Sequence, residues 1–466
     1  MSQQLLNDIE KSKDELDETI RQIHSWNYSQ PRQDVAHGRL LADGSIFEQD
    51  LTEEYSMSGK LTEAENQIRQ EISNLEDWSL ERSVIKTTLR KALGLILFAQ
   101  IRWNEAEMQF LQVLEVHKAL GLKRTDILRS MEDLASTYRK QSRWELAKEL
   151  DMQALRIREE AFGTGHLVTL ASMAGLALEY KELGQTTQAE GLEVQVVEIR
   201  KKRLGAEHPE TLNSMSNLAS TYRSQGRLKQ AEELNIEVKN TRSRLLGAEH
   251  PSTLTSVNNL AMTFFSQGRY DEAEQLFIYA VEASKRVQGK EDPETLVCMG
   301  NLAQTYAAQG RLDLAEKLDT QVLDIRKIVL GQEHLDTLAS MSDLASTYAA
   351  QDRWDQAEKL QLQIVETTER IHGADHPDTL TCTGNLEVTY SRQGRQNEAE
   401  KLKARVLETS KRILGLEHPD TLTCMSNLAS IYTQQGRKKE AEDLEAQAAE
   451  ISKRVVSLDH PDVARR

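Results

Sequence analysis

Five asparagines recur at a fixed interval along this 466-residue chain and are its clearest candidates for binding chemistry. They are Asn217, Asn259, Asn301, Asn385 and Asn427, and Asp343 stands in the one place that the series skips. Each step is 42 residues or twice that number. A side-chain amide both donates and accepts hydrogen bonds, so a row of amides can pair with the backbone of an extended peptide. The alternative is that these amides bond only between neighbouring helices.

Histidines recur as well, once per unit, at a position expected in a loop. They are His166, His208, His250, His334, His376, His418 and His460. A zinc site needs three or four ligands that converge on one point, and one residue per unit does not supply them. We therefore expect these histidines to cap the helices that follow, and we expect no metal. The variants His334-Leu335 and Asp292-Pro293 also favour a structural role.

Catalytic motifs are missing from the sequence: we find no HExxH string, nucleophile elbow, Walker loop or dinucleotide fingerprint. No unit departs from the pattern so as to assemble an acid, a base and a nucleophile. We expect a non-catalytic protein without a cofactor.

The bulk composition narrows the classes of partner. A formal net charge of -16 argues against nucleic acid, because phosphate binding needs a basic stripe. There is no polybasic cluster for an anionic membrane, and no apolar run approaches the roughly 18–20 residues that span a bilayer. Only three cysteines occur, which favours a reducing compartment, and we expect the cytoplasm.

The elements that position these residues follow from the same period of 42 residues. Between residues 208 and 247, apolar side chains from Leu212 to Tyr222 recur at steps of three and four, which predicts a helix. Gly226 ends this helix, and a second helix carries Ala231 and Val238. Ten such units fit residues 45–457. A single helix pair buries too little apolar surface to fold alone, so neighbouring units must pack together.

The turn inside each unit has its own signature. Glycine stands there in seven of the ten units. Ser142 and Asp352 replace it in two others and can adopt the same conformation, whereas the β-branched Ile101 resists it. One residue is missing between Ala106 and Gly121, so we expect the second helix of that unit to be one residue short.

Short strings in each unit resemble the tetratricopeptide repeat in a longer, 42-residue form. Examples are Asn217-Leu218-Ala219, Gln225-Gly226-Arg227 and Ala231-Glu232. They are similar to the repeats of kinesin light chains, and closer still to the C-terminal arrays of fungal NACHT and NB-ARC proteins. The resemblance covers about nine-tenths of the chain. It implies an all-α fold, a right-handed α-solenoid of about ten two-helix repeats.

The same resemblance implies that the first helix of each unit lines a concave groove. The asparagines would then point into that groove, beside small residues such as Ser216 and Ser220. Positive charge at Arg139, Lys140, Arg223 and Arg392 would attract acidic segments. The expected function is a scaffold or adaptor that binds peptide segments of other proteins. The alternative is a ligand-sensing regulatory array that acts with a separate NTPase, because this sequence carries no Walker motif.

The two ends of the chain lie outside the repeats. Residues 1–44 predict an amphipathic helix, with Ile9, Leu16 and Ile23 at seven-residue steps, followed by a loop. Residues 458–466 open a further unit and then stop, leaving a short tail. Because no capping repeat follows the last helix pair, we expect this end to contact a partner or another copy of the chain.

Overall fold

The computed structural model of the protein describes residues 51–74, 80–100, 102–121, 124–413, 415–417 and 419–459. Within these residues it contains 19 helices and no strand, which confirms the predicted all-α array. The predicted N-terminal segment 1–44 lies outside the described residues, as do residues 460–466 of the predicted tail.

The helices differ little in length and follow one another through short turns. They are α2 (Leu51–Asn74), α3 (Leu80–Ala99), α4 (Trp103–Ala119), α5 (Arg124–Lys140), α6 (Trp144–Phe162), α7 (Leu167–Glu182), α8 (Thr186–Leu204), α9 (Pro209–Ser224), α10 (Leu228–Leu246), α11 (Pro251–Ser266), α12 (Tyr270–Val287), α13 (Pro293–Ala308), α14 (Leu312–Val329), α15 (Leu335–Ala350), α16 (Trp354–His372), α17 (Pro377–Arg392), α18 (Gln396–Ile413), α19 (Pro419–Gln434) and α20 (Lys438–Asp459). We call the odd-numbered helices from α3 on the first helices, and the even-numbered helices from α4 on the second helices.

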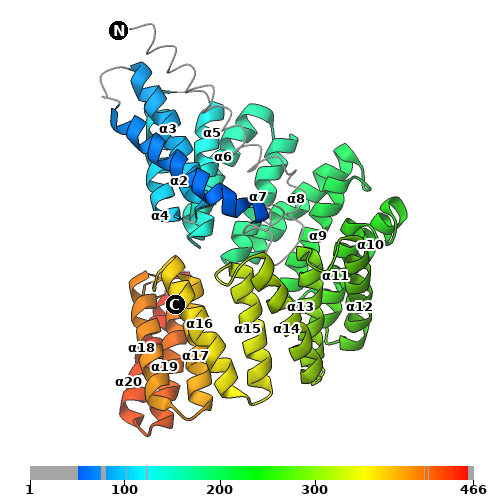
Figure 1. Ribbon diagram of the computed structural model, residues 1–466, viewed down its shortest axis with the longest axis vertical. Coiled ribbons are helices and arrows are strands. Elements are labelled where there is room, and N and C mark those ends of the chain that lie inside the picture. Colours follow the sequence, from blue (N-terminus) through cyan, green and yellow to red (C-terminus); the bar gives the residue numbers. More distant parts are fainter. Residues whose placement is uncertain are drawn as a thin grey trace, which may run out of the picture. The chain divides into compact units, whose positions relative to one another are not determined.

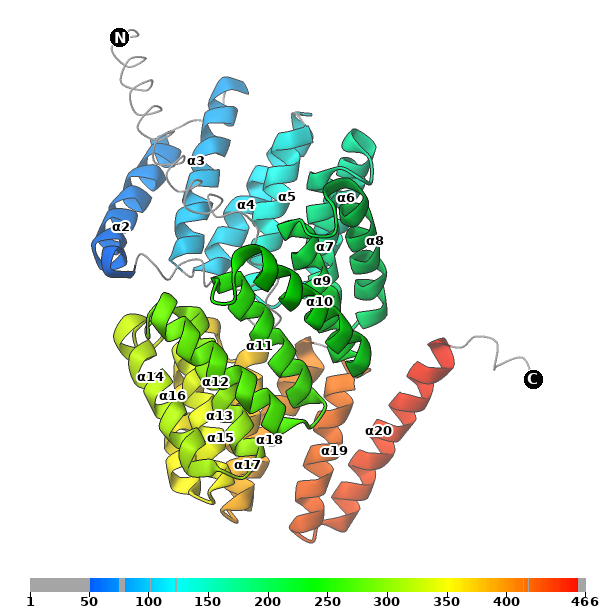
Figure 2. The same ribbon diagram turned by 90° about the vertical axis from the view of Figure 1, so that its right-hand side faces the viewer.

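The chain divides into two compact units, Met1–Cys298 and Met299–Arg466, with the boundary inside α13. In the first unit, each helix from α2 to α12 packs against the next, as the blue-to-green part of Figure 1 shows. In the second, the same holds from α14 to α20, and Figure 2 shows α19 and α20 side by side. Each unit is therefore a stack of helical hairpins.

The core of each stack is shared between adjacent hairpins. Leu212, Met215 and Leu218 of α9 pack with Val238 of α10, and Val197 of α8 in the preceding hairpin joins the same cluster. The alanine of each second helix is almost fully buried where the helices approach closely, as at Ala231. The prediction that one helix pair completes its core with a neighbour is confirmed.

The turn between paired helices depends on one left-handed residue. Gly226 has a φ of +74°, and Arg227 N donates to Tyr222 O at 2.8 Å, which closes the end of α9. Ser142 and Asp352 take the same place with φ of 54° and 58°. The prediction that these two residues replace glycine is confirmed, whereas Ile101 lies outside the described residues.

The first predicted hairpin is different. Gly59, the first of the seven turn glycines, lies inside α2, which runs without a break from Leu51 to Asn74. The predicted turn at this position is wrong, because glycine permits a turn but does not require one and is tolerated inside a helix. Nine helix pairs follow α2 in the described part of the chain. The prediction of a short second helix before Gly121 is confirmed, since α4 has 17 residues and α6 has 19.

The recurrent histidines cap the first helices, as predicted. In each case Nδ1 accepts a hydrogen bond from the backbone N–H two residues later, at 3.2–3.3 Å, for His166, His208, His250, His334 and His376. Asp292 does the same with Oδ1, which accepts from Glu294 N at 3.0 Å. His418 and His460 lie outside the described residues.

One position of the second helices is usually polar, and most of its side chains are buried, although Asp151 is only partly buried and Glu445 of α20 is exposed. Its residues are Asp151, Glu193, Asn235, Asp319, Gln361 and Lys403, with Phe110 and Phe277 at the same place in α4 and α12. Two of the polar residues bond to a threonine of the following first helix. Asn235 Nδ2 donates to Thr263 Oγ1 at 3.0 Å, and Thr347 Oγ1 lies 2.7 Å from Asp319 Oδ2. These pairs satisfy polar groups that burial would otherwise destabilise.

Candidate functional site

The five predicted asparagines occupy one position on the first helices. Asn217 and Asn259 lie on α9 and α11 of the first compact unit, and both are half-buried. In the second unit, Asn301 on α13 is half-buried, and Asn385 on α17 and Asn427 on α19 are exposed. Within each unit the amide therefore recurs at the same place of the first helices, with Asp343 of α15 interrupting the series in the second unit.

Four of these amides have unused hydrogen-bonding capacity. Within the described residues, no hydrogen bond reaches the side-chain amides of Asn217, Asn259, Asn385 or Asn427. Asn301 and Asp343, in contrast, each interact with another group. Bonding between neighbouring helices therefore does not account for those four amides. Each can both donate to a ligand and accept from it.

In the first unit, two earlier first helices carry another residue at the position of Asn217. Asp133 on α5 is buried and forms an ion pair with Lys91, whose Nζ lies 3.2 Å from Oδ2. Gly175 on α7 offers no side chain. Sequence reasoning missed both, although the 42-residue step backwards from Asn217 leads to them. The amide row of this unit thus consists of Asn217 and Asn259.

Two positive charges also lie close together on α7 and α9 of the first unit. Arg223 is half-buried, and Lys181 stands at the same position one repeat earlier. Lys181 Nζ lies 3.3 Å from Ser220 Oγ on α9. Burial lowers the pKa of Lys181, the Glu193 carboxylate opposes this shift, and Arg223 adds to it. The two cations are thus close enough to reinforce each other's potential. Sequence reasoning named Arg223 and overlooked Lys181.

Arg139, one more repeat earlier, is held by two acidic side chains. Its Nη1 lies 2.6 Å from Asp151 Oδ2 and 2.5 Å from Glu179 Oε1. Burial and the neighbouring Asp151 raise the pKa of Glu179 to about 9, although Arg139 opposes this shift. The charge of Arg139 is therefore balanced inside the protein. Arg392, the predicted cation of the second unit, is exposed on α17.

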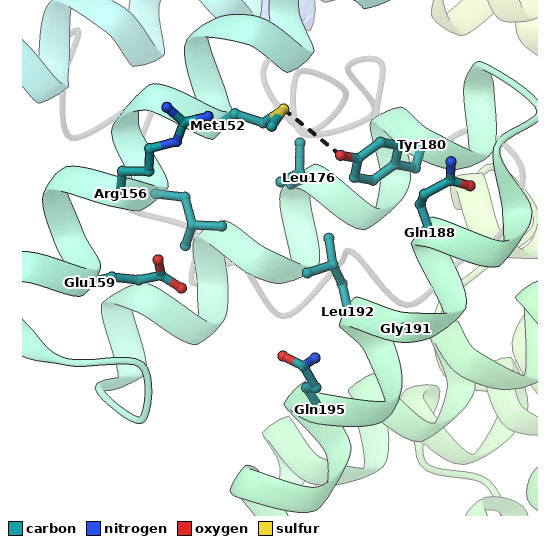
Figure 3. Close-up of a pocket in the computed structure, with 10 residues that line it drawn as sticks. Met152, Arg156, Glu159, Leu176, Tyr180, Gln188, Gly191, Leu192 and Gln195 are labelled. Carbon is teal, nitrogen blue, oxygen red and sulfur yellow. Dashed lines mark hydrogen bonds between the residues drawn. The ribbon is translucent and has the colours of Figure 1, made fainter.

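A pocket of about 420 Å³ opens between the second helices α6 and α8. Figure 3 shows Leu176 and Tyr180 of α7 among the residues that line it, with Tyr180 Oη 3.8 Å from Met152 Sδ. Leu155 and Leu192 add apolar walls, and the polar residues of the lining are Arg156, Glu159, Gln188 and Gln195. The pocket combines an apolar interior with polar groups at its edge.

Gly191 on α8 opens this pocket. The equivalent residues of other second helices carry longer side chains: Glu149, Glu233, Gln275, Lys317, Lys359, Lys401 and Asp443. A Cβ added at Gly191 would meet nothing within 4 Å. The sequence contained this signal as a glycine at a position where the other second helices carry a longer side chain, which is polar in all of them except α4, where it is Met108.

The pocket between α6 and α8 is also open because an ion pair found between other second helices is missing there. Glu159 and Gln195 face the pocket, whereas their equivalents one repeat later, Lys201 and Glu237, form an ion pair at 3.7 Å. The equivalent residues of α16 and α18, Glu369 and Arg405, are also paired. Between α6 and α8, Glu159 and Gln195 cannot form such an ion pair, because glutamine carries no charge.

Comparison with known proteins identifies the repeat. A family model described as tetratricopeptide repeat matches residues 85–160, 126–202, 194–238, 210–277, 252–328 and 336–411, and a second model of the same description matches residues 421–462. No curated protein matches the chain.

Three solved structures are similar to this chain. The nearly identical TPR-like repeats of a kinesin-light-chain-type protein from Podosopora anserina are 30% identical, with a TM-score of 0.40, and the match covers 43% of this chain and 95% of that one. BtubC (BKLC) from P. vanneervenii is 20% identical, with a TM-score of 0.42, and the match covers 49% of this chain and 91% of that one. The apo form of the quorum sensor NprR from B. thuringiensis is 15% identical, with a TM-score of 0.48, and the match covers 77% of this chain and 99% of that one.

None of the described helices is both long enough and apolar enough to cross a membrane.

Proposed function

Because this chain belongs to the tetratricopeptide-repeat family, we propose that it is a non-catalytic scaffold that binds extended peptide segments of partner proteins along its first helices. The observation that carries this proposal is the set of four side-chain amides without a hydrogen-bond partner at one repeat position. They are Asn217, Asn259, Asn385 and Asn427. Accessible amides at regular intervals suit a ligand that is itself a regular row of donors and acceptors, and an extended backbone is such a ligand.

The spacing of the helices fits an extended chain. The first helices α9 and α11 contact each other directly, and packed helices lie about 8–10 Å apart. An extended peptide advances about 3.3 Å per residue, so roughly three of its residues pass each repeat. Pairing through backbone groups would tolerate many ligand sequences, and the positions between the amides would supply selectivity.

Charge favours an acidic residue in the segment that binds the first unit. Lys181 reaches Ser220 on α9 and feels the positive charge of Arg223 on the same helix, so the repulsion between the two cations would fall if a carboxylate bound between them. A protein with a net charge of -16 gains selectivity from such a local cationic patch, because most of its remaining surface repels acidic segments. We therefore expect protein partners in the cytoplasm rather than nucleic acid or membrane.

The test is affinity purification from the native cell with wild type and two quadruple variants. The first replaces the free amides: Asn217→Ala, Asn259→Ala, Asn385→Ala and Asn427→Ala. The control carries Asn240→Ala and Asn397→Ala on the second helices, where both asparagines are exposed, together with Lys229→Ala and Lys438→Ala. Loss of specific partners only in the first variant, with an unchanged thermal melt, supports the proposal. An identical partner list for all three proteins overturns it.

A further inference from the structure

At the turn from α16 to α17, two histidines and an aspartate bring three metal-ligand atoms together. Nδ1 of His372 lies 3.2 Å from Nδ1 of His376, and Oδ2 of Asp378 lies 3.6 Å from the first nitrogen and 3.5 Å from the second. Among the residues that the structure describes, no other group of three His, Cys, Asp or Glu side chains gathers its ligand atoms within 4.8 Å.

The triangle of these atoms has the size that a zinc ion requires. The point equidistant from the three atoms lies about 2.0 Å from each, and zinc binds imidazole nitrogen at about 2.0–2.1 Å and carboxylate oxygen at about 2.0–2.2 Å. The two nitrogens and the oxygen therefore need to move only slightly to bind one ion.

The local fold fixes the two rings and leaves the carboxylate accessible. His372 is the last residue of α16, His376 caps α17, and Asp378 is the second residue of α17. The side chains of His372 and His376 are only 1% and 8% exposed, whereas that of Asp378 is 56% exposed. The rings are held by packing, and an ion can enter from the side of Asp378.

His372 is a departure from the repeat. At the same distance before the cap, the other described turns carry Phe162, Leu204, Leu246, Gln288 or Leu330. The turn from α14 to α15 is the nearest equivalent, because it has His334 and Asp336, with Nδ1 3.9 Å from Oδ2, but Leu330 in place of the second histidine. The residues at this place in other repeats, such as Leu246 and Leu330, are exposed or half-buried, whereas the His372 side chain is buried, so the repeat pattern alone does not explain the imidazole.

We propose that His372, His376 and Asp378 bind a divalent first-row transition ion, with zinc as the best fit. Two imidazoles and one carboxylate suit zinc, whereas magnesium and calcium prefer oxygen ligands throughout. Three protein ligands leave one tetrahedral position for water or for a group of a partner molecule. The bound ion would join the end of α16 to the start of α17.

Binding of an ion by His376 would break a hydrogen bond that the structure contains. Nδ1 of His376 accepts the backbone N–H of Asp378 at 3.2 Å, and an ion would take the same lone pair. Metal binding therefore exchanges the helix cap for a bond to the ion.

The test is calorimetric titration of the full chain, without an affinity tag and after treatment with a chelator, using ZnCl₂ alone. We expect one zinc ion per chain with micromolar or tighter affinity. His372→Leu and Asp378→Ser introduce residues that other repeats carry at these places, Leu330 and Ser252, so both variants should fold. His372→Leu should weaken binding by more than about 100-fold, the upper range for losses of outer-shell partners.

The matched control is His334→Asn, which changes a cap histidine that has no second histidine beside it. It should bind zinc like wild type. Zinc should also raise the thermal midpoint of wild type and leave that of His372→Leu unchanged. Absence of binding to wild type below about 1 mM, or an equal loss in His334→Asn and His372→Leu, overturns the proposal.

Discussion

Arg227 lies over the ring of Tyr222, with its guanidinium carbon 4.2 Å from the ring centroid. The same guanidinium donates from Nη1 to Glu190 Oε1 at 2.6 Å, on the second helix of the preceding repeat. Gln225 Nε2 donates to the other oxygen of Glu190 at 3.0 Å. The turn of one repeat is thus bonded to the helix of the repeat before it.

This clamp recurs along the chain. The stacked pairs are Arg143–Tyr138, Arg227–Tyr222, Arg269–Phe264, Arg311–Tyr306, Arg353–Tyr348, Arg395–Tyr390 and Arg437–Tyr432, at 4.0–4.7 Å. The arginine also pairs with a glutamate of the preceding second helix in six cases: Glu107, Glu190, Glu232, Glu316, Glu358 and Glu400. Because the aromatic ring orients the arginine, the same clamp forms in each of these six cases.

Replacement of Arg227 by lysine should weaken this junction although it keeps the charge. A lysine ammonium cannot lie flat on the ring and donate to Glu190 from a planar fork at the same time. We expect a lower thermal midpoint for Arg227→Lys, and a larger decrease when Arg269→Lys is added. Circular dichroism at low and high salt would measure it, with Lys229→Ala on the exposed side of α10 as the control. A midpoint equal to that of the control would contradict the clamp.

Asp319 predicts a pH dependence of stability. Burial raises its pKa to about 7, the hydrogen bond from Thr347 opposes this shift, and the charge of Asp343 adds to it. The folded chain therefore keeps this proton up to about pH 7, while the unfolded chain releases it near the ordinary value of 3.8. Folding takes up a proton between these values, so this group makes the free energy of unfolding fall as pH rises through that window.

The variant Asp319→Asn removes this titration and has a natural precedent. Asn235 occupies the equivalent place in α10 and bonds to Thr263, the equivalent of Thr347. We expect the variant to be more stable than wild type at pH 8 by at least about 1 kcal/mol, and the difference to shrink at pH 5. Urea denaturation at both pH values would measure it. An equal difference at both would show that Asp319 does not titrate in this window.

The hairpin array was predictable because its signals are local and repeated. The spacing of Leu212, Met215 and Leu218 indicates a helix, and Gly226 marks its end, in repeat after repeat. The caps at His208 and His250 followed from their place just before a helix. The prediction was wrong at Gly59, where one weak signal stood alone and α2 continued through it.

Contacts between repeats were not predictable in the same way. Arg227 and Glu190 are 37 residues apart, and only the packing of α8 against α9 shows that they meet. The pocket at Gly191 depends on the space between α6 and α8. His372 joins His376 and Asp378 only because the turn after α16 folds back on itself. The unpartnered state of the Asn217 amide likewise required knowledge of all its neighbours.

Gly191 offers a test of how the pocket is formed. A glycine inside a helix costs about 0.5–1 kcal/mol relative to alanine, and a Cβ at this site would meet nothing within 4 Å. Gly191→Ala should therefore raise the free energy of unfolding by that amount in urea denaturation. Gly184 in the preceding turn is the matched control, because its φ of +69° disfavours alanine, and Gly184→Ala should destabilise by about 1 kcal/mol. If Gly191→Ala destabilised as well, the space above α8 would be filled in solution, and the glycine would serve packing rather than an open pocket.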